Sequence, residues 1–168
     1  MGSNRLRLSL ALAVLVVLCG AISVSAQVIQ VDGATITEYG LYAVTEVEQT
    51  IDREDGGRVV DNWRLTEATT TVPATLGTSF GFQFVIEGKP VAKNIEIGFR
   101  LTHPEITDPE SGRSMTVQQW KDRVDIGAVK HTAYAFSTPW EVSPGDWTFE
   151  VFYGDKKLCN KTFTVVEQ

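Results

Sequence analysis

Cysteine is scarce in this chain, and its scarcity excludes a disulfide framework. The sequence holds two cysteines, Cys19 and Cys159, and Cys19 lies in an N-terminal segment that we expect to be removed. A single remaining thiol cannot form an intramolecular disulfide, whatever the redox state of the compartment. Cys159 is in phase with Phe163 and Val165 in the last apolar stretch, which predicts a small buried hydrophobe. A reactive or intermolecularly paired thiol is the alternative.

Histidine is equally scarce, because His103 and His131 are the only two in the sequence. Three carboxylates follow His103 closely, namely Glu105, Asp108 and Glu110, but their spacing matches no established metal-ligand pattern. We therefore interpret the stretch from His103 to Gly112 as a solvated acidic loop and as the candidate partner-contact loop of the protein. His131 is expected at the start of a strand, where a surface or half-buried imidazole is the ordinary outcome.

The chain also offers little to nucleophilic catalysis or phosphate binding. The segment Gly77–Gly81 leads into a β-rich stretch and not into a helix, so it lacks the helix N-terminus that holds phosphate, and we interpret it as a turn. The thiol of Cys159 lies in an expected strand and not at a helix start. The sequence thus assigns no catalytic, cofactor-binding or metal-ligating residue.

Long apolar runs are missing after the N-terminus. Arg5 and Arg7 accompany an apolar run from Leu6 to Cys19, and small residues precede a predicted cleavage after Ala26. That run is shorter than the roughly 20 residues of a membrane-spanning helix, which favours a signal peptide over residues 1–26 and a periplasmic or secreted protein with no integral membrane segment. Leu18 is too large to precede a lipid-modified cysteine, so a lipoprotein anchored through Cys19 is disfavoured.

Positive charge is in deficit. The formal net charge is −6, and it becomes −8 once Arg5 and Arg7 are removed with the signal peptide. Such a surface disfavours nucleic acid as a partner, because phosphate attraction dominates those affinities. The remaining chain has the length of one domain, which we place at 39–168 after an N-terminal leader at 27–38 that can add an edge strand.

What the chain does contain is alternation with a period of two residues. Apolar residues alternate in 79–87 and again in 94–102, so these segments predict two strands, which we expect to pair in antiparallel fashion. A first hairpin is predicted from 39–48 and 59–72 around a charged turn at 52–57, and a closing hairpin from 147–153 and 158–166.

The segment between these hairpins is less regular. Two prolines and a glycine predict an irregular stretch at 102–112, and a capping-box spacing at Thr116 predicts a short helix near 116–124. A further strand is expected at 131–136, with Tyr134 and Phe136 inward. These elements predict an all-β fold, an immunoglobulin-like antiparallel β-sandwich of roughly seven strands with at most one short helix.

The aromatic residues have two interpretations. Tryptophans and tyrosines that point outward would form a stacking platform for sugars or anchors for a partner protein. The stronger expectation is a core role, because Trp147 is in phase with Phe149 and Val151, and Trp140 is expected to cover one end of the sandwich. Phe152 falls on the opposite face and is the better candidate for exposure.

Four pieces of sequence, in this order, resemble a family of uncharacterised bacterial exported proteins, the domain of unknown function DUF3859. They are Tyr39-Gly-Leu-Tyr, Phe80-Gly-Phe-Gln-Phe-Val-Ile-Glu-Gly-Lys-Pro, His103-Pro-Glu-Ile-Thr-Asp-Pro-Glu-Ser-Gly and Pro144-Gly-Asp-Trp. The resemblance covers nearly all of the chain after the signal peptide. It implies a β-sandwich of the cell envelope and supplies no activity and no site residues.

Three functional hypotheses stay open on the sequence. The leading one is a non-enzymatic module that binds an envelope protein or a glycan, through an exposed sheet face or through the loop with His103, Glu105, Asp108 and Glu110. The second is a small envelope hydrolase that uses loop carboxylates and a histidine. The third is a structural or self-assembling module with an exposed edge strand.

Overall fold

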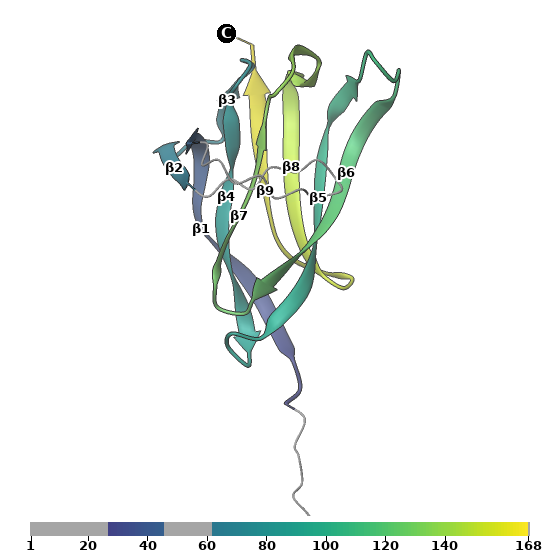
Figure 1. Cartoon of the computed structure of the whole chain (residues 1–168). Helices are drawn as coiled ribbons and strands as arrows, with labels where there is room; N and C mark the ends of the chain where they lie inside the picture. Colours follow the sequence, from purple (N-terminus) through teal and green to yellow (C-terminus); the bar gives the residue numbers. More distant parts are fainter. Residues whose placement is uncertain (1–26, 46–61, 168) are drawn as a thin grey trace, which may run out of the picture.

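The computed structural model describes residues 27–45 and 62–167, which form two β-sheets packed face to face (Figure 1). The four-stranded sheet has the order β2 (Asn62–Glu67), β1 (Gln30–Thr45), β4 (Ser79–Lys89) and β7 (Val129–Ala135). The five-stranded sheet has the order β3 (Thr71–Pro73), β9 (Lys156–Val166), β8 (Gly145–Tyr153), β5 (Asn94–Thr107) and β6 (Ser114–Asp125). Every pair is antiparallel except β3 with β9. The predicted all-β sandwich is confirmed, with nine described strands in place of roughly seven.

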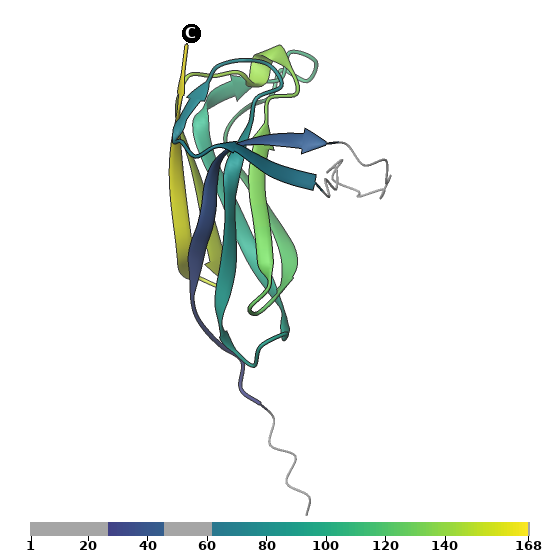
Figure 2. The same ribbon diagram turned by 90° about the vertical axis from the view of Figure 1, so that its left-hand side faces the viewer.

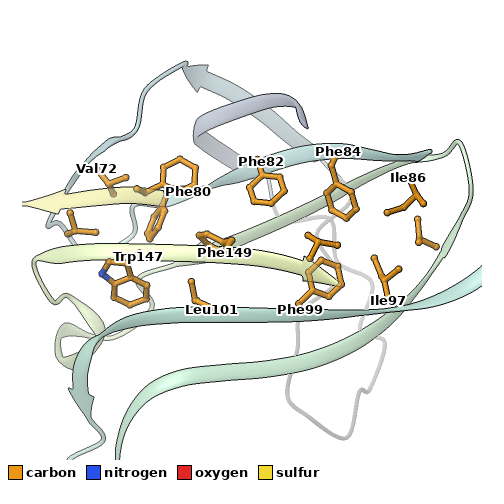
Figure 3. Close-up of a cluster of buried hydrophobic side chains, with 14 of the residues drawn as sticks. Val72, Phe80, Phe82, Phe84, Ile86, Ile97, Phe99, Leu101, Trp147 and Phe149 are labelled. Atoms are coloured by element: carbon orange, nitrogen blue, oxygen red, sulfur yellow. The ribbon is translucent and has the colours of Figure 1, made fainter. Parts of the chain in front are cut away.

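The core lies between the sheets and is built from the alternating residues of β4, β5 and β8 (Figure 3). Phe80, Phe82 and Phe84 of β4 have no exposed surface, and the rings of Phe80 and Phe149 meet edge to face at 5.9 Å. Trp147 is fully buried and its indole N–H donates to the Ser143 carbonyl at 3.0 Å. The predicted inward faces of these three strands are therefore confirmed.

Strands β4 and β5 do not pair, although the sequence predicts that they do. β4 pairs with β1 and β7, whereas β5 pairs with β6 and β8 in the other sheet. The residues 90–93 carry the chain from one sheet to the other, so the apolar faces of β4 and β5 oppose each other across the core, with Phe84 and Phe99 in ring contact at 6.1 Å. The apolar faces of β4 and β5 thus belong to the two facing layers of one sandwich core.

The helix predicted near 116–124 is wrong, because this segment lies within β6. Gln118 pairs with Leu101 and Trp120 pairs with Phe99, and the two aromatic rings stack at 5.2 Å. The alternation is hidden in the sequence because two inward positions, Gln118 and Asp122, are polar. They are tolerated at the edge of the sandwich, where Gln118 bonds His103 and Asp122 receives the Lys130 ammonium at 2.6 Å.

The irregular stretch predicted from 102 begins too early, because β5 continues to Thr107. The ladder between β5 and β6 is interrupted between Thr102 and Ile106, so Pro104 lies in a β-bulge, where a missing N–H is tolerated. Gly145 lies directly against Pro104: a Cβ at Gly145 would come within 2.8 Å of the Pro104 ring, and the φ angle of Gly145 is +127°. Only glycine fits there without strain.

The predicted leader is part of the fold. Residues 30–38 form the first half of β1 and pair with β4 alone, so they add an edge segment to the four-stranded sheet, while residues 41–45 also pair with β2. At Gly40, where φ is +147° and a Cβ would collide with the Glu67 carbonyl, β1 leaves the sheet, and its second half runs with β2 away from the sandwich (Figure 2). The first predicted hairpin is confirmed for 41–45 with 62–67, whereas Thr71 and Val72, predicted as part of it, lie in β3 of the other sheet. Its turn at 52–57 and the signal peptide at 1–26 lie outside the described residues.

Lysines close both open sides of the sandwich. On one side the Lys161 ammonium lies 3.4 Å from the centre of the Tyr39 ring, and the Lys156 ammonium donates to the Val31 and Asp32 carbonyls at 3.1 and 2.7 Å. On the other side the Lys130–Asp122 ion pair joins β7 to β6. Cation–π and ion-pair contacts at these half-buried positions hold the sheet edges together where the apolar core ends.

Cys159 is half-buried and packs against the core. Burial raises the pKa of its thiol to about 11, so the sulfur is protonated at neutral pH. This position agrees with a small hydrophobe and leaves little thiolate for reaction.

Phe82→Asp should abolish folding, because it places an unpaired charge in the most aromatic part of the core. The expected loss exceeds about 4 kcal/mol, which is comparable to the whole stability of a small domain. Lys93→Asp adds the same side chain at an exposed turn position and should change stability by less than about 1 kcal/mol. Urea unfolding followed by tryptophan fluorescence measures both, and a cooperative native-like transition for Phe82→Asp would contradict this core.

Native Cys159 should react slowly with iodoacetamide at neutral pH and rapidly once the protein is unfolded in urea. The raised thiol pKa and the partial burial both reduce the reactive thiolate. Mass spectrometry of the labelled protein gives the two rates. Equal rates in the native and unfolded states would show that the thiol is accessible.

Candidate functional site

His103 is not a loop residue, because it is a buried residue of β5. Its ring stacks on Trp147 with a centroid distance of 4.7 Å, and 4 % of the residue is exposed. Nδ1 donates to the Pro104 carbonyl at 2.7 Å, which leaves Nε2 to accept from the Gln118 amide at 3.2 Å. Both ring nitrogens are engaged in hydrogen bonds, so His103 acts as a packing and hydrogen-bonding residue of the fold.

The three carboxylates predicted with His103 lie elsewhere. Glu105 is exposed on the bulge, and Asp108 and Glu110 belong to the turn between β5 and β6. Asp108 holds that turn: it accepts from the Glu110 N–H at 2.9 Å and from the Ser111 hydroxyl at 2.6 Å. These hydrogen bonds lower the pKa of Asp108. The four residues thus form no common site, and within 27–45 and 62–167 no group of three or more potential ligands could hold a metal ion.

The segment Gly77-Thr-Ser-Phe-Gly81 matches the letters of a nucleophile elbow but not its geometry. An elbow presents its serine on a turn between a strand and a helix. Here Ser79 begins β4, is 5 % exposed, and is followed by strand, and its hydroxyl has no hydrogen-bond partner among the described residues. The serine therefore belongs to the core end of β4.

A polar and aromatic cluster lies where the β1–β2 arm leaves the four-stranded sheet. Trp63 and His131 have nearly parallel rings 6.0 Å apart, and Tyr42 lies edge-on to both. Burial lowers the pKa of His131, while Glu38 opposes and Lys130 supports this shift. Burial also raises the pKa of Tyr42, and the Glu38 carboxylate adds to the effect. Tyr42 is 6 % exposed, so this cluster attaches the arm to the sheet and leaves little room for a ligand.

An accessible hollow lies on the outer face of the five-stranded sheet, over β5, β6 and β8. Its volume is about 400 Å³, and it is open to solvent along its length. Its centre is Gly98, which pairs with Phe152 on one side and Lys121 on the other. Because glycine has no side chain, the flanking side chains stand above a bare strip of backbone. The lining residues are Gly98, Phe99, Arg100, Gln119, Trp120, Lys121, Phe152, Gly154 and Asp155. We call this hollow the Gly98 groove.

The polar side chains of the Gly98 groove are arranged by cross-strand pairing. Arg100 stands beside Glu150 on β8 and Gln119 on β6. Its guanidinium lies 4.9 Å from the centre of the Phe152 ring and 3.4 Å from a Glu150 oxygen. On the far side of Glu150 the Lys157 ammonium binds the other carboxylate oxygen at 2.5 Å. At the β6 wall, Lys121 pairs with Glu96 at 2.8 Å, and this contact lowers the pKa of Glu96.

The sequence indicates part of this groove through its alternation, although it does not indicate it as a contact site. The alternation in 94–102 and 147–153 already predicts Arg100 and Phe152 on the outer face, and both lie there. The pairing of β5 with β6 and β8 is what brings them together around Gly98, and strand order is not readable from alternation.

Comparison with solved structures defines the class of fold. The chain resembles an immunoglobulin-like protein from Pseudomonas aeruginosa, with 27 % identity and a TM-score of 0.55 over 83 % of this chain and 98 % of that one. The protein is therefore an immunoglobulin-like β-sandwich, as predicted. It belongs to the family described as Domain of unknown function (DUF3859), whose model matches residues 30–165 and confirms the predicted resemblance. No curated protein matches the chain. Within the described residues, no helix has the length and apolar character needed to cross a membrane.

Stability should fall as the pH drops below about 6.5, in part through His131. The pKa of His131 is lowered in the folded state, so the unfolded chain binds the proton more readily. The contribution of His131 to the free energy of unfolding is therefore complete above the unfolded-state pKa, and it is lost as the pH falls through the folded-state pKa. His131→Gln should flatten this part of the curve. Urea unfolding at several pH values measures the effect, and a His131 NMR titration midpoint at or above the ordinary value would contradict the assignment.

Proposed function

We propose that this protein is an exported, non-enzymatic binding module of the bacterial envelope, and that it binds a glycan in the Gly98 groove. The observation that carries the proposal is the groove itself: a bare glycine strip between a half-buried aromatic ring and a row of charged and amide side chains. Pockets for small ligands combine apolar surface with a few convergent polar groups in this way. The export component rests on the arginines, the apolar run and the small residues of the N-terminal segment.

The polarity of the groove favours a sugar over a protein partner. Protein interfaces depend on apolar anchors that fill desolvated pockets. Around the groove the outer face carries Gln119, Arg100 and Glu150 in one row, and the next row consists of three threonines and the exposed Val117, with Phe152 as the aromatic residue of the face. Hydroxyl groups of a sugar match such donors and acceptors, while the ring of Phe152 offers an apolar surface to its C–H groups.

The same geometry favours binding over hydrolysis. Two of the three carboxylates at the groove are in ion pairs, since Glu150 holds Arg100 and Lys157 and Glu96 holds Lys121, while the third, Asp155, is exposed at its rim. Hydrolysis of a glycosidic bond would need a carboxylic acid with a raised pKa. His103 and His131 lie on other faces of the fold, one buried against Trp147 and one against Trp63.

Gly98→Val should weaken glycan binding by at least about tenfold, because it fills the floor of the groove. A Cβ at Gly98 would lie 3.9 Å from the Phe152 Cβ, an ordinary contact, and valine suits a strand, so the fold should persist. Gly33→Val is the matched control: it is the same change in a strand of the other sheet, with nothing within 4 Å of the added Cβ. Binding to a panel of neutral and acidic oligosaccharides is measured by NMR shift perturbation with ¹⁵N-labelled protein.

Shifts confined to Gly98 and its lining residues, lost in Gly98→Val and retained in Gly33→Val, are expected. Absence of any shift across the panel would count against glycan binding. Shifts centred on the turn at 108–113 would restore the predicted contact loop and move the site away from the groove.

A further inference from the structure

We infer that the sugar held in the Gly98 groove carries a carboxylate, and that Arg100 is the residue that selects it. This inference rests on the proposed glycan binding and names the chemical class of the ligand. Its basis is the Arg100 side chain: the guanidinium is held in position by two contacts, and most of its hydrogen-bond donors are unused within the described part of the chain.

Two contacts hold the guanidinium of Arg100 in place. It lies over the Phe152 ring at 4.9 Å, and one of its nitrogens, Nη1, contacts Glu150 at 3.4 Å. Cation–π stacking restrains the guanidinium, so the Arg100 side chain has little conformational entropy left to lose when a ligand binds. A pre-oriented arginine fork is the group that best matches the two oxygens of a carboxylate.

Most of the donors of this fork remain available. A guanidinium has five N–H donors. The Glu150 contact, at the long end of hydrogen bonding, uses one of them, and 43 % of the Arg100 side chain is exposed. No other hydrogen bond of this guanidinium occurs within the described residues. Arg100 lines the groove that Gly98 opens.

A ligand carboxylate can engage Arg100 without leaving Glu150 uncompensated. Glu150 is 12 % exposed in its side chain, so the loss of both of its cations would leave a buried charge and would be costly. Lys157 contacts the other oxygen of Glu150 at the shorter distance of 2.5 Å and would keep it paired. The arrangement therefore allows Arg100 to be shared with a ligand while the sheet face stays neutralised.

The local charge limits how much negative charge a ligand can bring. The groove lining holds the cations of Arg100 and Lys121 and the anion of Asp155. Counted together with Glu150, Glu96 and Lys157, which form ion pairs here, the positive and negative charges cancel. A carboxylate therefore adds one negative charge to a neutral patch, whereas a phosphate dianion would add two and would also meet repulsion from Asp155.

The test compares trigalacturonic acid with its methyl ester, which has the same sugar skeleton without the charges. Affinities are measured by isothermal titration calorimetry for the wild-type protein, Arg100→Lys, Arg100→Gln and the control Arg113→Gln. Arg113 is exposed near the β5–β6 turn, so the control removes the same charge away from the groove. Thermal melts of all four proteins report whether they are folded.

The wild-type protein should prefer the acid by roughly tenfold or more, since a bidentate charge-assisted contact is among the strongest polar interactions. Arg100→Gln should abolish this preference while ester binding stays. Arg100→Lys should retain part of it, because the charge remains and the fork is lost. Arg113→Gln should behave as the wild type.

The other outcomes separate a failure of carboxylate selection from a failure of glycan binding. Equal wild-type binding of acid and ester would overturn carboxylate selection and leave glycan binding intact. Binding of neither, together with no shifts in the oligosaccharide panel, would overturn both. Tighter binding of glucose 6-phosphate than of galacturonic acid would replace carboxylate by phosphate as the recognised group. The wild-type comparison decides the inference even if an Arg100 variant fails to fold.

Discussion

Edge-to-face packing of aromatic rings between the two sheets is the interaction on which the rest of this structure depends. The ring of Phe80 contacts four other aromatic rings with centroid distances of 5.4 to 5.9 Å, namely those of Phe136, Trp147, Phe149 and Phe163. A cysteine pair joins the sheets in many immunoglobulin-like domains. The described part of the chain has no such pair, since Cys159 is free, and the interlocked rings take its place. Because aromatic pairs are directional, they also set how the two sheets lie over each other, and so they position β5 and β8 under the groove.

Much of this core could be predicted from the sequence, because β4, β5 and β8 alternate strictly and each buries one face. The arrangement of those strands could not. A connection as short as 90–93 can form a hairpin or carry the chain across to a facing sheet, and the choice depends on which partners cover the two apolar faces. The strand β6 was concealed for a related reason: its inward face is polar at Gln118 and Asp122, where the partners His103 and Lys130 are distant in sequence.

The candidate site shows the same division. The predicted loop gathered residues that are close in sequence, and the structure separates them, with His103 in the core and Asp108 in a turn. The groove gathers residues that are distant in sequence, since Arg100, Lys121 and Phe152 meet through strand pairing. The alternation of each strand predicts which of these side chains point outward. Their convergence on Gly98 depends on strand order, which is set by the packing of the whole molecule.

The position of Gly98 within its strand has a consequence for the thermodynamics of binding. β5 is paired on both sides, by β6 and by β8, and its reverse face is covered by Phe99 and the core. The floor of the groove is therefore part of a strand that is hydrogen-bonded on both sides and not of a loop. A ligand that lies on it need not order any main chain, so the conformational entropy that many loop-based sites lose on binding has already been lost on folding.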